Sequence, residues 1–163
     1  MNPDEKIQAH LVSVWRESKK FFSVGGREGM LVLTNNHLTF VHKTESKMNW
    51  WKAITQRQVI NFLKSKNTMI HHDGYSEKDL SNDLDNIKNI ELEFDDIKKI
   101  SFKEETWGSV LYLEYEKNDK NENFQYSIAQ DWVKYPVKEP TKFMKVDWDP
   151  FVQYIKERQK FTK

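Results

Sequence analysis

Two short apolar segments, separated by only three polar residues, lie in the stretch GREGMLVLTNNHLTFVHK at residues 26–43. Both segments, Met30–Thr34 and Leu38–Val41, are rich in residues that favour strands, and each is about one strand long. Between them, Asn35 and Asn36 are typical of a tight turn, because Asn tolerates positive φ better than most residues. The stretch therefore predicts a β-hairpin.

The first strand of this hairpin is apolar on both of its faces. Leu31 and Leu33 alternate with Met30 and Val32, so neither side of the strand suits water. A strand of this kind is usually covered on both sides. We therefore expect the hairpin to be interior, with Leu33 and Phe40 buried.

Length and composition describe one domain that can bury a core without covalent cross-links. The chain has 163 residues, of which 37% are apolar and 13% are aromatic, and aromatic side chains bury large areas. Cysteine is absent, which excludes disulfides, thiolate metal sites and cysteine nucleophiles. We find neither a signal peptide nor an apolar run of about 18 residues, so we expect a cytoplasmic protein.

Helical spacing of apolar residues predicts a helix near each end of the chain. The first begins with Asn2 as N-cap and Pro3 in the first turn, and its apolar residues are Ile7, Leu11, Val14 and Trp15. The last has Asp149 as N-cap and Pro150 at its first position, followed by Phe151, Val152 and Ile155.

Two more helices are expected between the hairpin and the later strands. The first covers residues 47–64, where apolar residues again recur at helical spacing. The second is short and is capped by Ser76, with Asp79 as the acid of a capping box.

Strands are expected from residue 90 onwards. They cover residues 90–94, 97–103, 108–116 and 122–130, with a turn at Asp95 and Asp96. A polar hairpin loop is expected at residues 116–123, and residues 131–146 should be irregular or form a short strand. Phe21–Val24 is expected to form a strand before the hairpin.

This order of elements resembles the pleckstrin-homology-like (PH-like) superfamily, and most closely its GRAM subgroup and bacterial relatives. The likeness rests on Gly29–Asn35 with Leu38–Phe40, and on IELEFDDIKKI at residues 90–100. It implies an α+β fold, a PH-like antiparallel β-barrel with a C-terminal capping helix. To this barrel the chain adds an N-terminal helix and a helical insertion at about residues 46–89, within one domain of residues 1–163.

The insertion carries the candidate binding surface, because its charge is uneven. Residues 46–72 contain five Lys or Arg residues and no acid, whereas residues 73–105 contain eleven acids against five lysines. The candidate ligand or membrane surface consists of Trp50, Lys52, Arg57, Lys64 and Lys66. This basic helix suits an anionic membrane or a phosphate backbone, or it packs its apolar stripe on the barrel with its cations facing the acidic segment.

Catalytic and metal sites are not expected. His71, His72 and Asp73 are metal-ligand types, but adjacent histidines rarely reach one ion together. Glu91 and Glu93 share a strand face, which suits an acid–base pair or simply a solvated surface. We expect no catalytic residues, no cofactor and no bound metal, and we expect His37 and His42 at the surface.

These observations favour a non-enzymatic binding or scaffolding module, most of all for a protein partner. The alternatives are peripheral binding to anionic lipids through the insertion, and a small-molecule enzyme that uses the acidic strand. A net charge of +1 favours no nucleic-acid partner. The first loop of the barrel pairs one cation, Arg27, with one anion, Glu28, which is not a phosphoinositide-binding pattern. The oligomeric state is left open.

Overall fold

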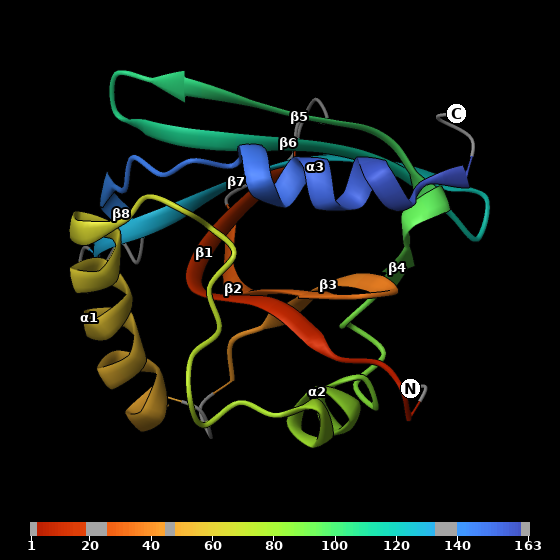
Figure 1. Ribbon diagram of the computed structural model, residues 1–163, viewed down its shortest axis with the longest axis horizontal. Coiled ribbons are helices and arrows are strands. Elements are labelled where there is room, and N and C mark those ends of the chain that lie inside the picture. Colours follow the sequence, from red (N-terminus) through yellow and green to blue (C-terminus); the bar gives the residue numbers. More distant parts are fainter. Residues whose placement is uncertain (1–2, 19–25, 45–47, 133–139, 161–163) are drawn as a thin grey trace.

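Antiparallel strands dominate the structure, a computed structural model that describes residues 3–18, 26–44, 48–132 and 140–160 (Figure 1). The strands are β1 (Ile7–Ser18), β2 (Gly26–Thr34), β3 (His37–His42), β4 (Glu91–Glu93), β5 (Ile97–Glu105), β6 (Gly108–Lys117), β7 (Lys120–Trp132) and β8 (Pro140–Phe143). The helices are α1 (Met48–Lys64), α2 (Glu77–Asp83), the short 3-10 helix η2 (Phe94–Asp96) and α3 (Asp149–Arg158).

The sheet follows the order β4-β3-β2-β1-β7-β6-β5, with β8 paired to β7. The long strand β1 joins the two parts of the sheet, because it pairs with β2 on one side and with β7 on the other. Helix α3 lies between the two parts, against β5 and η2 (Figure 1). Eight antiparallel strands in one sheet are followed by a closing helix, so the predicted α+β fold class is confirmed.

The predicted N-terminal helix is wrong, because residues 7–18 form strand β1. The register of β1 against β2 shifts between Leu11 and Val14, where Ser13 has a φ of 53°. The bulge shifts by one position the residues that point to each face of the sheet. As a result, the apolar residues before and after the bulge recur at intervals that resemble those of a helix. Residues 7–18 adopt the strand conformation because β1 forms backbone hydrogen bonds with β2 along one edge and with β7 along the other.

The predicted hairpin is confirmed as β2 and β3, with Leu33 opposite Leu38. Its turn needs no positive φ at Asn35 or Asn36; instead the Thr34 hydroxyl accepts hydrogen bonds from the backbone of the two residues after Asn35. A side chain at Gly29 would overlap the Phe40 ring, which explains why glycine stands there.

A second hairpin is tighter than expected. Strands β6 and β7 run up to Lys117 and from Lys120, so the predicted loop at residues 116–123 is mostly strand. Asn118 and Asp119 alone form the turn, and both have positive φ, at 55° and 63°. The strand expected at Phe21–Val24 lies outside the described residues.

Two apolar clusters lie on opposite sides of the β1–β3 part of the sheet. The inner one contains Leu31, Leu33, Leu38 and Phe40 from the hairpin together with Phe151, Val152 and Ile155 of α3. The outer one contains Val12, Met30, Val32 and Val41 from the strands with Trp51 and Ile54 of α1 and Leu80 of α2. The expectation that both faces of the hairpin are covered is therefore confirmed, and α1 and α2 cover the outer face.

The remaining helices begin close to where their capping signals predict. Helix α2 has Ser76 as N-cap, and Ser76 and Asp79 form both hydrogen bonds of the capping box. Helix α3 begins at Asp149, so its N-cap is Trp148, one residue before the predicted one. Within the described residues, no helix is both long enough and apolar enough to cross a membrane.

Candidate functional site

Helix α1 places the predicted basic segment on the outside of the fold. Its inward side buries Trp51, Ile54 and Phe62, which have exposed fractions of 2%, 3% and 2%. The Trp51 indole nitrogen donates hydrogen bonds to the Ser13 hydroxyl at 3.1 Å and to the Glu28 carboxylate at 3.0 Å. The helix is thus held against β1 and β2 by both apolar and polar contacts.

Gln58 fixes α1 to the bulge of β1. Its side-chain oxygen accepts from the Val12 backbone nitrogen at 2.9 Å, and its side-chain nitrogen donates to the Val12 carbonyl at 2.7 Å. Gln58 is fully buried. Bulged residues lose ladder hydrogen bonds, and here a side chain 46 positions away supplies two of them. Sequence reasoning missed this residue, because one polar residue on a helix carries no local signal of such a role.

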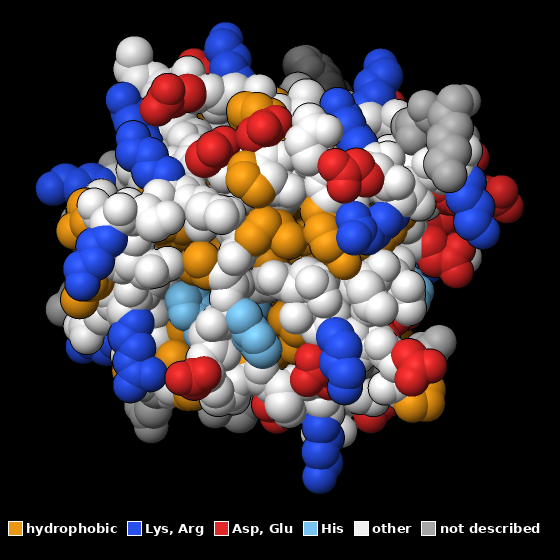
Figure 2. All heavy atoms as spheres, in the orientation of Figure 1, with side chains coloured by type: hydrophobic (Ala, Val, Ile, Leu, Met, Phe, Trp, Pro, Cys, Tyr) orange, Lys and Arg blue, Asp and Glu red, His pale blue; other side chains and the backbone are white. Residues whose placement is uncertain are grey.

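The outward side of α1 combines cations with apolar residues. Lys52, Arg57 and Lys64 are exposed, and Lys66 is exposed just beyond the helix. Ile60 and Leu63 lie beside them with exposed fractions of 55% and 73%. Figure 2 shows Lys and Arg side chains interspersed with hydrophobic ones on its left side, over α1.

These cations form no ion pair with any residue that the structure describes. We expected these cations to face the acidic segment after residue 72. Among the described residues, no ion pair joins them to that segment. Their charge is available to a partner.

Trp50 differs from the other predicted surface residues, because it points inward. Its ring stacks on buried His10 with centroids 5.9 Å apart and lies 6.1 Å from Tyr75. Burial and the Asp83 carboxylate, which accepts the Tyr75 hydroxyl at 2.6 Å, raise the pKa of Tyr75. The structure thus separates Trp50 from the cations with which sequence reasoning grouped it.

His71 and His72 hold a loop rather than converge on one point. The His72 Nε2 atom lies 2.9 Å from the Gln58 side-chain oxygen, and the His71 Nε2 atom lies 2.9 Å from the Tyr75 carbonyl oxygen. Burial lowers the pKa of His72 to about 4, so its imidazole is neutral at neutral pH. Both histidines line an open hollow of about 390 Å³ beside Arg57.

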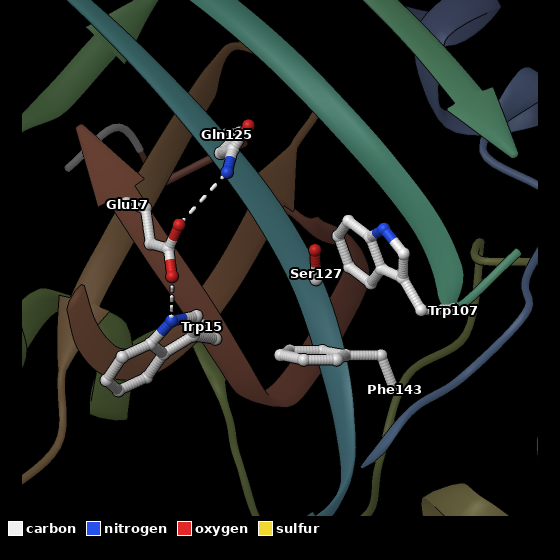
Figure 3. A pocket seen from close by; sticks show the side chains of 6 residues that line it. All are labelled: Trp15, Glu17, Trp107, Gln125, Ser127 and Phe143. Carbon is white, nitrogen blue, oxygen red and sulfur yellow. Dashed lines mark hydrogen bonds between the residues drawn. The ribbon is translucent and has the colours of Figure 1, made fainter. Parts of the chain in front are cut away.

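An aromatic pocket of about 230 Å³ lies where β1, the β5–β6 turn, β7 and β8 meet (Figure 3). Its lining residues are Trp15, Glu17, Trp107, Gln125, Ser127 and Phe143. The Trp107 and Phe143 rings meet edge to face with centroids 5.3 Å apart, and 48% of Trp107 is exposed.

Glu17 gives this pocket its charge. Its two carboxylate oxygens accept from the Trp15 indole at 2.7 Å and from the Gln125 amide at 3.0 Å, so the group is held in one orientation. Aromatic faces beside a fixed carboxylate suit a cationic or flat side chain. Sequence reasoning did not bring these lining residues together, since they lie far apart along the chain.

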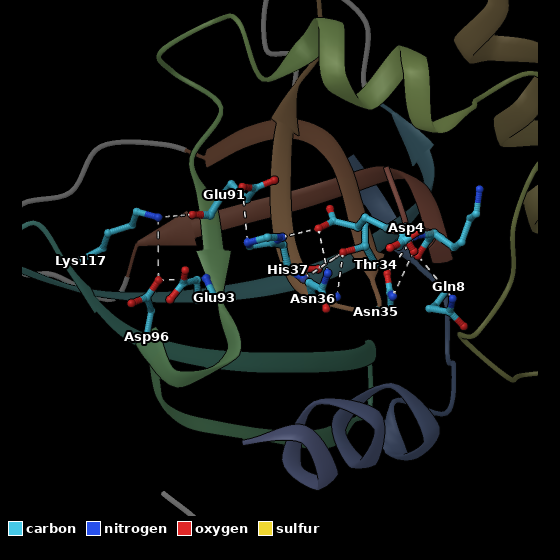
Figure 4. A network of polar contacts seen from close by, with 12 residues as sticks. Asp4, Gln8, Thr34, Asn35, Asn36, His37, Glu91, Glu93, Asp96 and Lys117 are labelled. Carbon is cyan, nitrogen blue, oxygen red and sulfur yellow. Dashed lines mark hydrogen bonds and ion pairs between the residues drawn. The ribbon is translucent and has the colours of Figure 1, made fainter. Parts of the chain in front are cut away.

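The two acids of strand β4 do not form a pair. Glu91 approaches His37, with 3.5 Å between its carboxylate and Nε2, while Glu93 is exposed (Figure 4). His37 and His42 are half-buried rather than at the surface. His42 is held by the Asn89 side chain, and burial lowers its pKa.

No protein-family model matches the sequence, and no curated protein matches it either. Among solved structures, the chain is similar to the Vps36 N-terminal PH domain, with 14% identity and a TM-score of 0.44 over 95% of this chain and 79% of that one. It is also similar to the hSac2 domain from human phosphoinositide phosphatase Sac2, with 12% identity and a TM-score of 0.42 over 100% of this chain and 73% of that one.

Proposed function

We propose that this chain is a non-enzymatic binding module that docks an acidic protein segment on the outward side of α1. One observation carries the proposal: two large apolar side chains, Ile60 and Leu63, are exposed among cations that have no described ion-pair partner. Apolar anchors ringed by charges of one sign are what a charged amphipathic partner recognises.

The shape of this surface suits a helix or an extended segment. Arg57, Ile60 and Lys64 follow one another at spacings of three and four, so they form a single ridge along α1. A partner with Asp or Glu residues flanking Leu or Phe would bury Ile60 and pair with Arg57 and Lys64. The expected partner is therefore an acidic segment with apolar residues spaced to match.

A membrane fits this surface less well than a protein does. The aromatic anchor expected at the membrane surface, Trp50, is turned towards His10. Each remaining cation near an anionic surface is worth about 1 kcal/mol, and screening limits its reach to about 8 Å at physiological ionic strength. Lipid binding through α1 would therefore be weak and sensitive to salt.

Selection of ligands from a random-peptide display library tests the proposal. Peptides enriched on the wild-type chain should contain Asp or Glu with Leu or Phe, and the double variant Arg57→Glu/Lys64→Glu should bind them at least about tenfold more weakly. Exchanging the peptide acids for lysine should restore binding to that variant. The control, Lys99→Glu/Lys120→Glu, changes net charge equally but at exposed positions on β5 and β7.

Two results would overturn the proposal. One is enrichment of peptides whose binding is the same for the wild type and the α1 variant. The other is robust sedimentation with anionic phospholipid vesicles at physiological salt that the α1 variant loses, which would assign α1 to the membrane.

The aromatic pocket supports a second contact for the same function. We propose that it receives one Arg or Lys side chain of a partner, because Glu17 lies fixed between aromatic rings. Acetyl-arginine amide should quench the tryptophan fluorescence of the wild type, and Trp107→Ala should remove the response. Unchanged quenching in Trp107→Ala would exclude the pocket.

A further inference from the structure

Three potential metal ligands from separate parts of the chain meet at one end of the β1–β4 sheet. Two of them, His37 and Glu91, are labelled in Figure 4. Glu5 precedes β1, His37 begins β3 and Glu91 begins β4. Each offers one ligand atom, and these three atoms lie within 4.8 Å of one another. The His37 Nδ1 atom is 2.7 Å from Glu5, and its Nε2 atom is 3.5 Å from Glu91.

Burial makes this arrangement costly without a cation. The Glu5 side chain has no exposed area, and its Oε2 atom has no hydrogen-bond partner among the described residues. The Oε2 atom of Glu91 is likewise buried without a described partner. A buried carboxylate oxygen without a hydrogen-bond donor loses its hydrogen bonds to water, and no protein hydrogen bond replaces them. Such atoms are rare in native proteins.

The charges nearby do not balance the two carboxylates. One imidazole supplies at most one positive charge against two negative ones. Lys117, which reaches this end of the sheet, contacts the backbone oxygen of Glu91 and the Asp96 carboxylate, the latter at 3.8 Å. Asn36 donates to Glu5 at 3.4 Å but carries no charge. Glu5, whose side chain has no exposed area, thus contacts one imidazole and no described Lys or Arg side chain.

We propose that Glu5, His37 and Glu91 bind one divalent transition-metal ion, with Zn²⁺ preferred. An imidazole nitrogen with two carboxylate oxygens is a donor set that Zn²⁺ uses, and a water molecule completes four ligands. Affinity of such nitrogen and oxygen sites rises from Mn²⁺ to Cu²⁺ and falls again at Zn²⁺, which should still bind here more tightly than Mn²⁺. The ion supplies the missing positive charge and partners for the two free oxygens.

The position of the site indicates a structural role. Glu91 is the first residue of β4, directly after α1, α2 and the loop that follows them, and β4 is only three residues long. The ion joins this short edge strand to β3 and to the segment before β1. It therefore fixes the point at which the segment carrying α1 and α2 returns to the barrel.

Titration calorimetry on chain treated with a chelator tests the proposal. The wild type should bind one Zn²⁺ per chain, bind Mn²⁺ more weakly, and gain thermal stability with Zn²⁺. Glu5→Gln, His37→Gln and Glu91→Gln should each lose more than about 100-fold in Zn²⁺ affinity, and Asn36→Ala about tenfold, because it only orients a ligand. Co²⁺ should give visible absorption bands that the three ligand variants lack.

Two controls separate this site from other donors. Glu93→Gln removes an exposed carboxylate two residues further along β4, and His71→Ala removes one of the paired histidines; neither should change Zn²⁺ affinity. His37→Gln and Glu91→Gln replace half-buried side chains, so they remain informative if Glu5→Gln does not fold. Absence of Zn²⁺ binding, or binding that survives these two changes and disappears in His71→Ala, would overturn the proposal.

Discussion

Replacing Gln58 by alanine removes both hydrogen bonds that fix α1 to the bulge of β1. The Val12 backbone nitrogen and oxygen would lose their partners at a place that is fully buried. An unsatisfied buried group costs about 1–3 kcal/mol, so two such groups, partly relieved by relaxation or water entry, should cost about 3 kcal/mol. For a chain of this length that corresponds to a fall in Tm of roughly 6–12 °C.

Urea unfolding measures this change. Tryptophan fluorescence, to which the buried Trp51 between α1 and β1 contributes, reports on tertiary packing, and far-UV circular dichroism follows the sheet. Coincident curves would justify a two-state free energy. Gln56→Ala is the matched control, because Gln56 is exposed on the same helix and should change the free energy of unfolding by less than about 0.5 kcal/mol.

A second substitution separates the two hydrogen bonds. Gln58→Glu keeps an acceptor for the Val12 nitrogen but turns a carboxylate oxygen towards the Val12 carbonyl, so it should destabilise at least as much as Gln58→Ala. If Gln58→Ala unfolds at the same urea concentration as Gln56→Ala, the bulge does not depend on α1 and the reasoning is wrong.

Three further predictions concern the core, the closing helix and pH. Phe40→Ala should cost about 3–5 kcal/mol in urea unfolding, whereas Phe102→Ala, at a position that is 42% exposed, should cost far less; equal effects would contradict the assigned core. Ending the chain before Asp149 removes the fully buried Phe151 and Ile155, so the product should show the poor NMR dispersion of a molten state, and native dispersion would show that α3 is not needed. Since burial lowers the pKa of His72 from 6.5 to about 4, the unfolded chain takes up a proton that the folded chain refuses, and stability should fall as the pH drops from 6.5 to 4. His72→Gln should flatten that part of the stability profile, and an unchanged slope would exclude His72 as its source.

Local signals in the sequence were sufficient for several elements. The Asn turn between two apolar runs predicted β2 and β3, and Ser76 with Asp79 predicted the start of α2. Apolar spacing predicted α1 to within one residue. Turn chemistry, capping and periodicity act between residues a few positions apart, so they can be read without knowing the rest of the fold.

Local sequence patterns predicted only part of the candidate sites. The cations of α1 stood out as a run of one sign, and the structure places them at the surface. The direction of Trp50 could not be read, because His10 and Tyr75, which it contacts, come from other segments. The aromatic pocket was missed for the same reason, since Trp15, Trp107 and Phe143 meet only after the sheet has closed.

The sequence alone determined that the chain contains a meander of strands, an interior hairpin and a basic helix, since these follow from composition and short-range pattern. Tertiary structure alone decided that residues 7–18 are a strand, that Gln58 completes its bulge, and that Glu5, His37 and Glu91 meet. The physical reason is that β1 hydrogen-bonds on both edges and packs on both faces. Its conformation therefore depends on partners in β2, β7 and α1, which lie up to about a hundred residues away and which no local pattern encodes.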